Sequence, residues 1–182
     1  MQIVKGTAYK AELGFIYDGD SFNLKLSSST GTESLGIICR LQWIDTPESQ
    51  KPNQTSSDPL VLKHWEWAKK AKTALMGLIQ NKALIAVPYE LDMYKRWACD
   101  VYLNVSSSKD LPLSNNVQLK MAQCGLAVSL LPYNRHIYSV RESNLLRSII
   151  SDAATANRKK VGLWSEPNMI LPHEFKKLSL SI

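Results

Sequence analysis

Short apolar runs interrupted by turn-forming residues fill the first third of the chain and limit the possible folds more than any other feature. The apolar runs are residues 9–16, 21–26 and 35–43. The breaks between them are Asp18-Gly19-Asp20 and the polar stretch 27–33. Apolar runs of this length bounded by turn residues are typical of strands. Asp-Gly favours a turn because glycine adopts a positive φ without steric cost. We therefore predict three strands here.

The rest of the chain mixes helical and strand patterns. Residues 47–59 contain three prolines among polar residues, which predicts an exposed loop. A helix should follow over about 61–78, where apolar residues three and four apart form one stripe. We also predict strands at 83–87 and 97–105 and helices at 117–124 and 140–160. This order indicates an α+β fold and is compatible with a barrel of the oligonucleotide-binding (OB) type, which periodicity alone leaves open.

Composition narrows the class of protein. The chain has 182 residues, which suits one domain, and 22 Lys and Arg against 16 Asp and Glu. Such a surplus suits a polyanion, although many basic proteins bind no nucleic acid. Three widely spaced cysteines without a CxxC pair indicate neither a zinc site nor a disulfide framework. No stretch reaches the roughly 20 apolar residues of a membrane span, and the first residues lack an apolar signal core, so we expect no membrane association.

Two acidic clusters stand at predicted strand ends. The carboxylates of Asp18-Gly19-Asp20 can both face a hard cation, although the triplet also suits an ordinary turn. Arg40 lies inside the third predicted strand, where a charge needs an anionic partner, and Asp45-Thr46-Pro47-Glu48 follows. One carboxylate for a metal ion and another for a water molecule would suit metal-assisted hydrolysis. The alternative is a structural pair of Arg40 and Asp45 beside a turn.

A third cluster, Asp92-Met93-Tyr94-Lys95-Arg96, precedes the last predicted strand. Arg96 can clamp a phosphoryl group or remain a solvated charge.

Together the clusters resemble the staphylococcal nuclease (thermonuclease) family. The resemblance rests on five motifs in order: Asp18-Gly19-Asp20-Ser21-Phe22, Arg40-Leu41-Gln42-Trp43-Ile44-Asp45-Thr46-Pro47-Glu48, Asp92-Met93-Tyr94-Lys95-Arg96, Gln123-Cys124-Gly125-Leu126-Ala127 and Leu163-Trp164-Ser165-Glu166. It covers about residues 5–168. We therefore expect a single domain over 1–182, with its core at about 5–168 and a short tail at 169–182.

The resemblance implies a five-stranded OB-fold-type barrel with three helices. It also implies Ca²⁺-dependent endonuclease or exonuclease cleavage of DNA and RNA, with little sequence choice and 3′-phosphate products. The resemblance implies that Asp20 and Asp45 bind Ca²⁺ through their carboxylates and Thr46 through its carbonyl, with Asp18 just outside that shell. It implies that Glu48 orients or deprotonates the attacking water and that Arg40 and Arg96 hold the scissile phosphate. Tyr94 and Tyr133 would contact the substrate.

Several positions depart from the family pattern. Met93 replaces a lysine, Lys95 a glycine and Leu131 a tyrosine, and the link to Asp92 looks shortened around Pro88. These changes predict a weaker grip on the substrate with an intact catalytic set. A catalytically inactive module that binds nucleic acid or protein on the same fold is the alternative function. We expect a monomer in the cytoplasm, where a weak calcium site would stand mostly empty.

Overall fold

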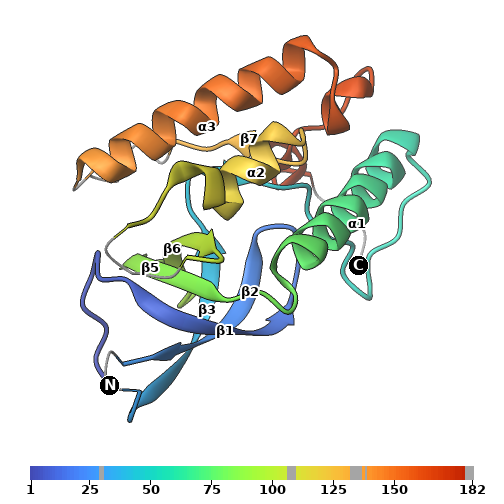
Figure 1. Cartoon of the computed structure of the whole chain (residues 1–182). Helices are drawn as coiled ribbons and strands as arrows, with labels where there is room; N and C mark the ends of the chain where they lie inside the picture. Colours follow the sequence, from blue (N-terminus) through green and yellow to red (C-terminus); the bar gives the residue numbers. More distant parts are fainter. Residues whose placement is uncertain (29–30, 106–109, 132–136, 138, 179–182) are drawn as a thin grey trace.

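The barrel is the centre of the molecule. The computed structural model describes residues 1–28, 31–105, 110–131, 137 and 139–178. Five strands close into a barrel in the order β1-β2-β3-β6-β5 (Figure 1). Their bounds are β1 Tyr9–Ile16, β2 Ser21–Ser27, β3 Ser34–Leu41, β5 Leu84–Leu91 and β6 Trp97–Leu103. Neighbouring strands are antiparallel except β3 and β6, whose parallel pairing closes the barrel. The predicted α+β class and five-stranded barrel are confirmed.

The helices cover the barrel on two sides. α2 lies between the barrel and the long helix α3, and α1 lies along the adjacent side (Figure 1). The bounds are α1 Pro59–Ile79, α2 Val117–Gln123, α3 Val140–Arg158 and α4 Pro172–Phe175, with 3₁₀ turns at Leu113–Asn115 and Gly162–Ser165. The three predicted helices are therefore present. The one-turn helix α4 was not predicted, because four residues give no readable period.

Local sequence explains where α1 begins and which face it buries. Asp58 accepts a hydrogen bond from the Leu60 N–H at 2.8 Å, and Pro59 occupies the first turn, where its missing N–H costs nothing. Ala71, Leu75 and Ile79 then repeat every four residues and are buried in the main core. That core also contains the barrel interior and the apolar stripe of α3, so one continuous core joins the elements.

The third predicted strand, 35–43, ends earlier than expected, at Leu41. Trp43 has a φ of 68°, a left-handed conformation that no strand can contain, and the chain turns there. The next two residues form a separate strand, β4 (Ile44–Asp45), which pairs with β7 (Val128–Ser129). Asp45 therefore lies within a strand, and the expectation that one strand runs down to it was wrong.

The fourth predicted strand, 83–87, is longer than expected. β5 continues through Pro88 to Leu91, with a register shift between Pro88 and Glu90 that accommodates the proline. The link to Asp92 is thus a continuous hairpin rather than a shortened loop. Lys95 lies in its turn with a φ of 61°, which explains why a glycine suits this position.

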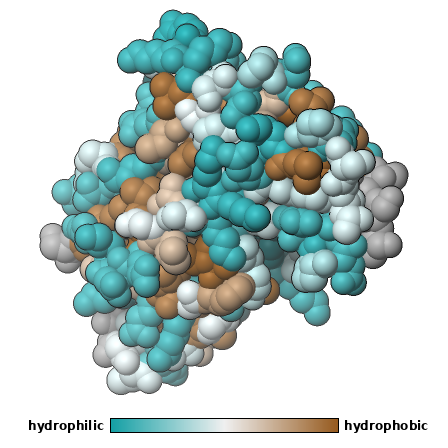
Figure 2. Space-filling model, turned by 90° about the vertical axis from the view of Figure 1, so that its right-hand side faces the viewer, coloured by the Kyte–Doolittle hydropathy of each residue, from teal (hydrophilic) through white to brown (hydrophobic). Residues whose placement is uncertain are grey.

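The surface around α1 mixes residue types. Figure 2 faces the side on which α1 lies and shows hydrophobic patches separated by hydrophilic residues. Among the described residues, no helix has the length and apolar composition needed to cross a membrane.

Candidate active site

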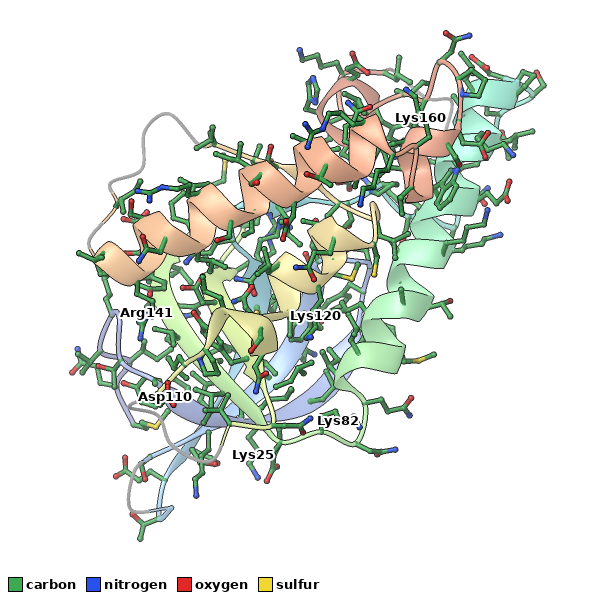
Figure 3. All side chains as sticks on the ribbon, turned by 45° about the horizontal axis from the view of Figure 1, so that its top comes forward. Lys25, Lys82, Asp110, Lys120, Arg141 and Lys160 are labelled. Atoms are coloured by element: carbon green, nitrogen blue, oxygen red, sulfur yellow. The ribbon has the colours of Figure 1, made fainter. Side chains whose placement is uncertain are left out.

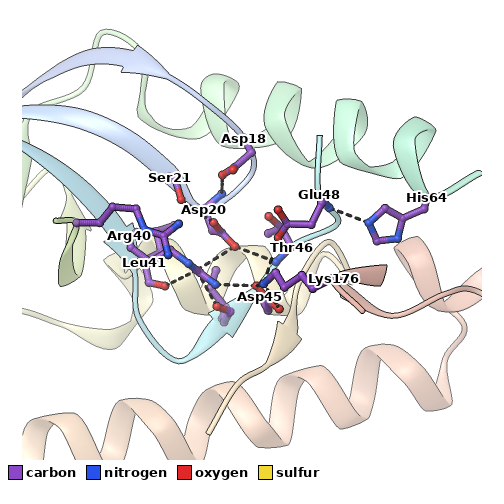
Figure 4. A network of polar contacts seen from close by, with 12 residues as sticks. Asp18, Asp20, Ser21, Arg40, Leu41, Asp45, Thr46, Glu48, His64 and Lys176 are labelled. Carbon is purple, nitrogen blue, oxygen red and sulfur yellow. Dashed lines mark hydrogen bonds and ion pairs between the residues drawn. The ribbon is translucent and has the colours of Figure 1, made fainter. Parts of the chain in front are cut away.

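Arg40 is the centre of a buried polar cluster (Figure 4). Its Nη1 lies 2.9 Å from Asp20 Oδ2, and its Nη2 lies 2.7 Å from Asp45 Oδ1. Nη1 also donates to the carbonyls of Leu41 and Ile44, at 2.9 Å each. Only 12% of the Arg40 side chain is exposed, so these acceptors replace water around its charge. Burial acts to lower the pKa of Arg40, but the neighbouring carboxylates outweigh it and raise the pKa.

Strand register brings Asp20 to this arginine. Ser21 opens β2 opposite Arg40 in β3, so the residue before Ser21 reaches the same end of the barrel. Asp20 Oδ2 accepts the Thr46 N–H at 2.9 Å, and Asp20 Oδ1 accepts the Ser21 hydroxyl at 3.0 Å. Burial favours the neutral acid, yet the charge of Arg40 and the Thr46 N–H hold the pKa of Asp20 below its ordinary value. Asp20 is therefore an ionised carboxylate.

Lys176 is a second cation in the cluster, and it follows α4 near the C-terminus. Its Nζ lies 2.7 and 2.8 Å from the two carboxylate oxygens of Asp45 and 3.1 Å from Glu48 Oε1. These carboxylates raise the pKa of Lys176 despite the opposing effect of burial. No local sequence pattern predicts this contact, because 131 residues separate Lys176 from Asp45.

Negative charge exceeds positive charge at this end of the barrel. The carboxylates of Asp20, Asp45 and Glu48 contact two cations, Arg40 and Lys176, and Asp18 lies beside Asp20, whose N–H it accepts (Figure 4). Burial and the charge of Asp20 raise the pKa of Asp18 to about 7. Burial also raises the pKa of Glu48, although Lys176 opposes the shift. Both shifts identify a place where another positive charge would be stabilised.

The loop that carries Glu48 is held by His64 of α1. The Glu48 N–H donates to His64 Nε2 at 2.8 Å, which leaves Nδ1 to donate to the Ile170 carbonyl at 2.9 Å. The imidazole is buried and stacks on Phe175 with ring centroids 3.7 Å apart. Burial lowers the pKa of His64 to about 4. No role is predicted for this histidine from the sequence, because only the fold brings Glu48 and Ile170 to α1.

A cavity of about 500 Å³ opens beside the cluster. Arg40, Lys176 and Arg96 all line it, together with Trp43, Asp92 and Met93. Three cationic residues and two acidic residues, Glu90 and Asp92, thus line the cavity, and arginine and lysine are the side chains that commonly bind phosphate groups. A larger hollow, of about 850 Å³, lies along β1, β2 and β3 and contains none of the predicted catalytic or metal-binding residues.

Arg96 is held on the hairpin between β5 and β6. Its Nε lies 2.8 Å from Asp92 Oδ2, and its backbone N–H donates to Asp92 Oδ1 at 2.9 Å. The guanidinium lies 5.3 Å from the centre of the Tyr94 ring, and Tyr94 is 68% exposed. Met93 and Leu131 are exposed as well. Tyr94 thus accompanies Arg96 but is not among the cavity-lining residues, and Tyr133 lies outside the described residues.

The predicted ligand set suits a hard divalent cation by its chemistry. The carboxylates of Asp20 and Asp45 both contact the Arg40 guanidinium, and Thr46 follows Asp45 directly. Carboxylate and carbonyl oxygens are the ligands that Ca²⁺ prefers. The excess of carboxylates would be neutralised by such an ion. Within the described part of the chain, no three His, Cys, Asp or Glu side chains form a metal-binding group, and the predicted set contains only two carboxylates.

Comparison with known proteins points to the same chemistry. Residues 38–166 match the family described as Staphylococcal nuclease homologue. Staphylococcal-like nuclease CAN1 of Arabidopsis thaliana is 28% identical over 138 residues, which is 76% of this chain and 32% of that protein. An uncharacterized 38.1 kDa protein of Capnoides sempervirens is 28% identical over 76% of this chain and 31% of its own length. Protein ParB of Escherichia coli is 24% identical over 93% of this chain and 80% of its own. The chain thus spans about a third of the two plant relatives.

Proposed function

Because the chain belongs to the family of staphylococcal nuclease homologues, we propose that it hydrolyses the phosphodiester bonds of DNA and RNA with the help of Ca²⁺. The observation that carries the proposal is one cavity lined by Arg40 and Arg96, next to the carboxylates of Asp20, Asp45 and Glu48. Low sequence specificity and 3′-phosphate products complete the proposal. A nuclease-type function is what family membership supports directly.

The positive side chains bind the substrate in this proposal. Phosphodiester hydrolysis places extra negative charge on the phosphate oxygens in the transition state. Arg40 is already oriented by its two carboxylates and two carbonyls, so little reorganisation is needed when charge develops. Arg96 lines the same cavity and would exchange Asp92 for a phosphate oxygen.

The acidic side chains have two roles in this proposal, which are binding of the cation and activation of the water. Asp20, Asp45 and the Thr46 carbonyl would hold the cation, which when bound supplies positive charge to the phosphate oxygens. Glu48 orients the attacking water and accepts its proton. Burial raises the pKa of Glu48, which makes its carboxylate a better base than an exposed glutamate. His64 holds the Glu48 backbone, so the position of this base is set by α1.

Purified full-length protein incubated with DNA and RNA in Ca²⁺, Mg²⁺ or EDTA tests the proposal. We expect both nucleic acids to be cut in Ca²⁺ and neither in EDTA. Phosphatase treatment of the fragments should release phosphate from 3′ ends. Full cleavage in EDTA would exclude the metal dependence, and binding without cleavage in every buffer would indicate an inactive binding module instead.

A further inference from the structure

The acidic site is completed by a segment that lies beyond the family match. The match ends at residue 166, whereas Ile170, Phe175 and Lys176 all contact the site. Phe175 stacks on His64 and is buried among Val61 and Trp65 of α1. Two backbone hydrogen bonds to Leu171, from Glu174 and Phe175, close the turn that precedes Lys176. The segment is therefore anchored, and its lysine is directed at the carboxylates.

The Lys176 ammonium has the surroundings of a bound cation. Three carboxylate oxygens lie within 2.7–3.1 Å of Nζ, two from Asp45 and one from Glu48. Asp45 is buried and also bound to Arg40, so both of its oxygens are engaged. A divalent cation held by Asp45 would need the oxygens that Nζ now contacts. Arg40 already occupies one of these oxygens, so a divalent ion added beside both cations would be repelled by Lys176 as well as by Arg40.

We propose that Lys176 is a built-in counter-cation of the metal site, which holds Asp45 and Glu48 in place without a divalent ion and is displaced when one binds. This inference rests on the proposed function, because it concerns the same ion. The side chain is 44% exposed, so it has a path into solvent. It also lines the cavity beside Arg40 and Arg96, where a substrate phosphate offers a new partner after displacement. Lys176 is thus a positioning residue for Glu48 rather than a catalytic residue.

Calcium binding to the full chain tests the displacement without measuring catalysis. Titration calorimetry would compare wild type, Lys176→Met and Lys176→Arg, with Lys177→Met as the matched control. Lys177 is the next residue and is exposed, so its loss changes the net charge equally. We expect Lys176→Met to bind Ca²⁺ about tenfold more tightly, because the competitor is gone, whereas Lys176→Arg and Lys177→Met stay within about twofold of wild type.

Thermal unfolding gives a second readout. In EDTA, Lys176→Met should lower the Tm, because two neighbouring carboxylates lose their shared partner. Saturating Ca²⁺ should then raise the Tm of this variant more than that of wild type. Lys177→Met should show neither effect.

The outcomes separate this inference from the proposed function. Equal Ca²⁺ affinities of wild type and Lys176→Met, or weaker binding by the variant, would overturn the displacement even if the wild type cleaves nucleic acid. Tighter binding by the variant without cleavage by any protein would support the displacement and contradict the nuclease proposal. Failure of every protein to bind Ca²⁺ would overturn both.

Discussion

At the scale of single residues, the site depends on side chains held by unusually many partners. Arg40 has four acceptors and Asp20 three donors, so each charge is fixed before any ligand arrives. Such preorganisation lets a charged group stabilise a transition state without first rearranging. Glu48 differs, because its side chain is 36% exposed and its carboxylate contacts only Lys176 among the ion pairs of the described residues. Glu48 is therefore the residue to change without disturbing the fold.

We expect Glu48→Gln to lower kcat by about 10²-fold or more, because glutamine cannot accept a proton from water. The Tm should stay close to that of wild type. Steady-state cleavage assays in saturating Ca²⁺ would measure the effect, with Glu12→Gln as the control. Glu12 is exposed and lies 3.9 Å from Lys25, away from the cavity. A folded Glu48→Gln protein with near-normal turnover would remove Glu48 from the mechanism.

Gly19 has a role that its sequence context did not indicate. The Asp-Gly pattern predicted a positive φ, but Gly19 is not among the positive-φ glycines. A Cβ on Gly19 would instead lie 2.8 Å from both Thr46 Oγ1 and Ala71 Cβ. The residue is small because the acidic turn, the residue that follows β4 and α1 meet there.

Gly19→Ala should therefore destabilise the protein by about 1–3 kcal/mol, the usual cost of overpacking a tight site. Gly77→Ala is the matched control, because no atom lies within 4 Å of a Cβ at this helical position. That control should stabilise the fold by roughly 0.5–1 kcal/mol. Urea unfolding measures both, and equal effects of the two substitutions would contradict the close approach at Gly19.

At the scale of elements, α1 and the segment after residue 166 act as one unit around Glu48. His64 accepts from the Glu48 backbone on one ring nitrogen and donates to Ile170 on the other. A neutral imidazole can do both, whereas the protonated ring has no acceptor for the Glu48 N–H. Protonation of this one helix residue thus breaks the hydrogen bond to the Glu48 backbone, whereas the donor to Ile170 remains.

This coupling predicts an acid-sensitive stability. The folded pKa of His64, about 4, lies below its unfolded value, so its contribution is present above about pH 6.5 and is lost as the pH falls toward 4. His64→Gln keeps an acceptor for Glu48 and cannot titrate. Between pH 7 and pH 4, we expect the free energy of unfolding of wild type to fall by roughly 2–3 kcal/mol more than that of this variant. Chemical denaturation across that range tests it, and parallel pH profiles would show that His64 does not carry the effect.

At the scale of the whole molecule, lysines occur on several separate elements. The lysines labelled in Figure 3 come from separate parts of the fold: Lys25 from β2, Lys82 from the turn after α1, Lys120 from α2 and Lys160 from the end of α3. The net charge of +6 therefore supplies a general attraction to nucleic acid. The cations of the cavity supply the local contact with phosphate.

Salt dependence separates these two contributions. Binding of the cleavage-deficient Glu48→Gln protein to single-stranded DNA should weaken steeply as salt rises, because bound phosphates release counterions. Arg96→Ala should reduce the slope of log affinity against log salt by about 0.7, the value for one phosphate contact on a single strand. Lys82→Ala should leave the slope almost unchanged. Equal slopes for all three proteins would show that Arg96 does not contact the bound strand.

The sequence by itself predicted the strands, and its motifs, through the family they resemble, predicted the barrel and the acidic cluster. Strand-length apolar runs and turn residues predicted four of the five barrel strands to within two residues at each end, because these signals are local. The acidic turn, Arg40 and the group around Asp45 were likewise readable as one site. The contact between Asp20 and Arg40 follows from the register of β2 and β3.

Tertiary structure alone decided what surrounds those residues. Asp45 became part of β4 only because β7, more than eighty positions later, pairs with it. Lys176 reaches Asp45 across 131 residues, and His64 reaches the Ile170 carbonyl across 106 residues, with Phe175 packed against α1. Periodicity describes which face of an element is buried, and it carries no information on which distant element covers that face. The counter-cation and the histidine link could therefore be found only in the folded chain.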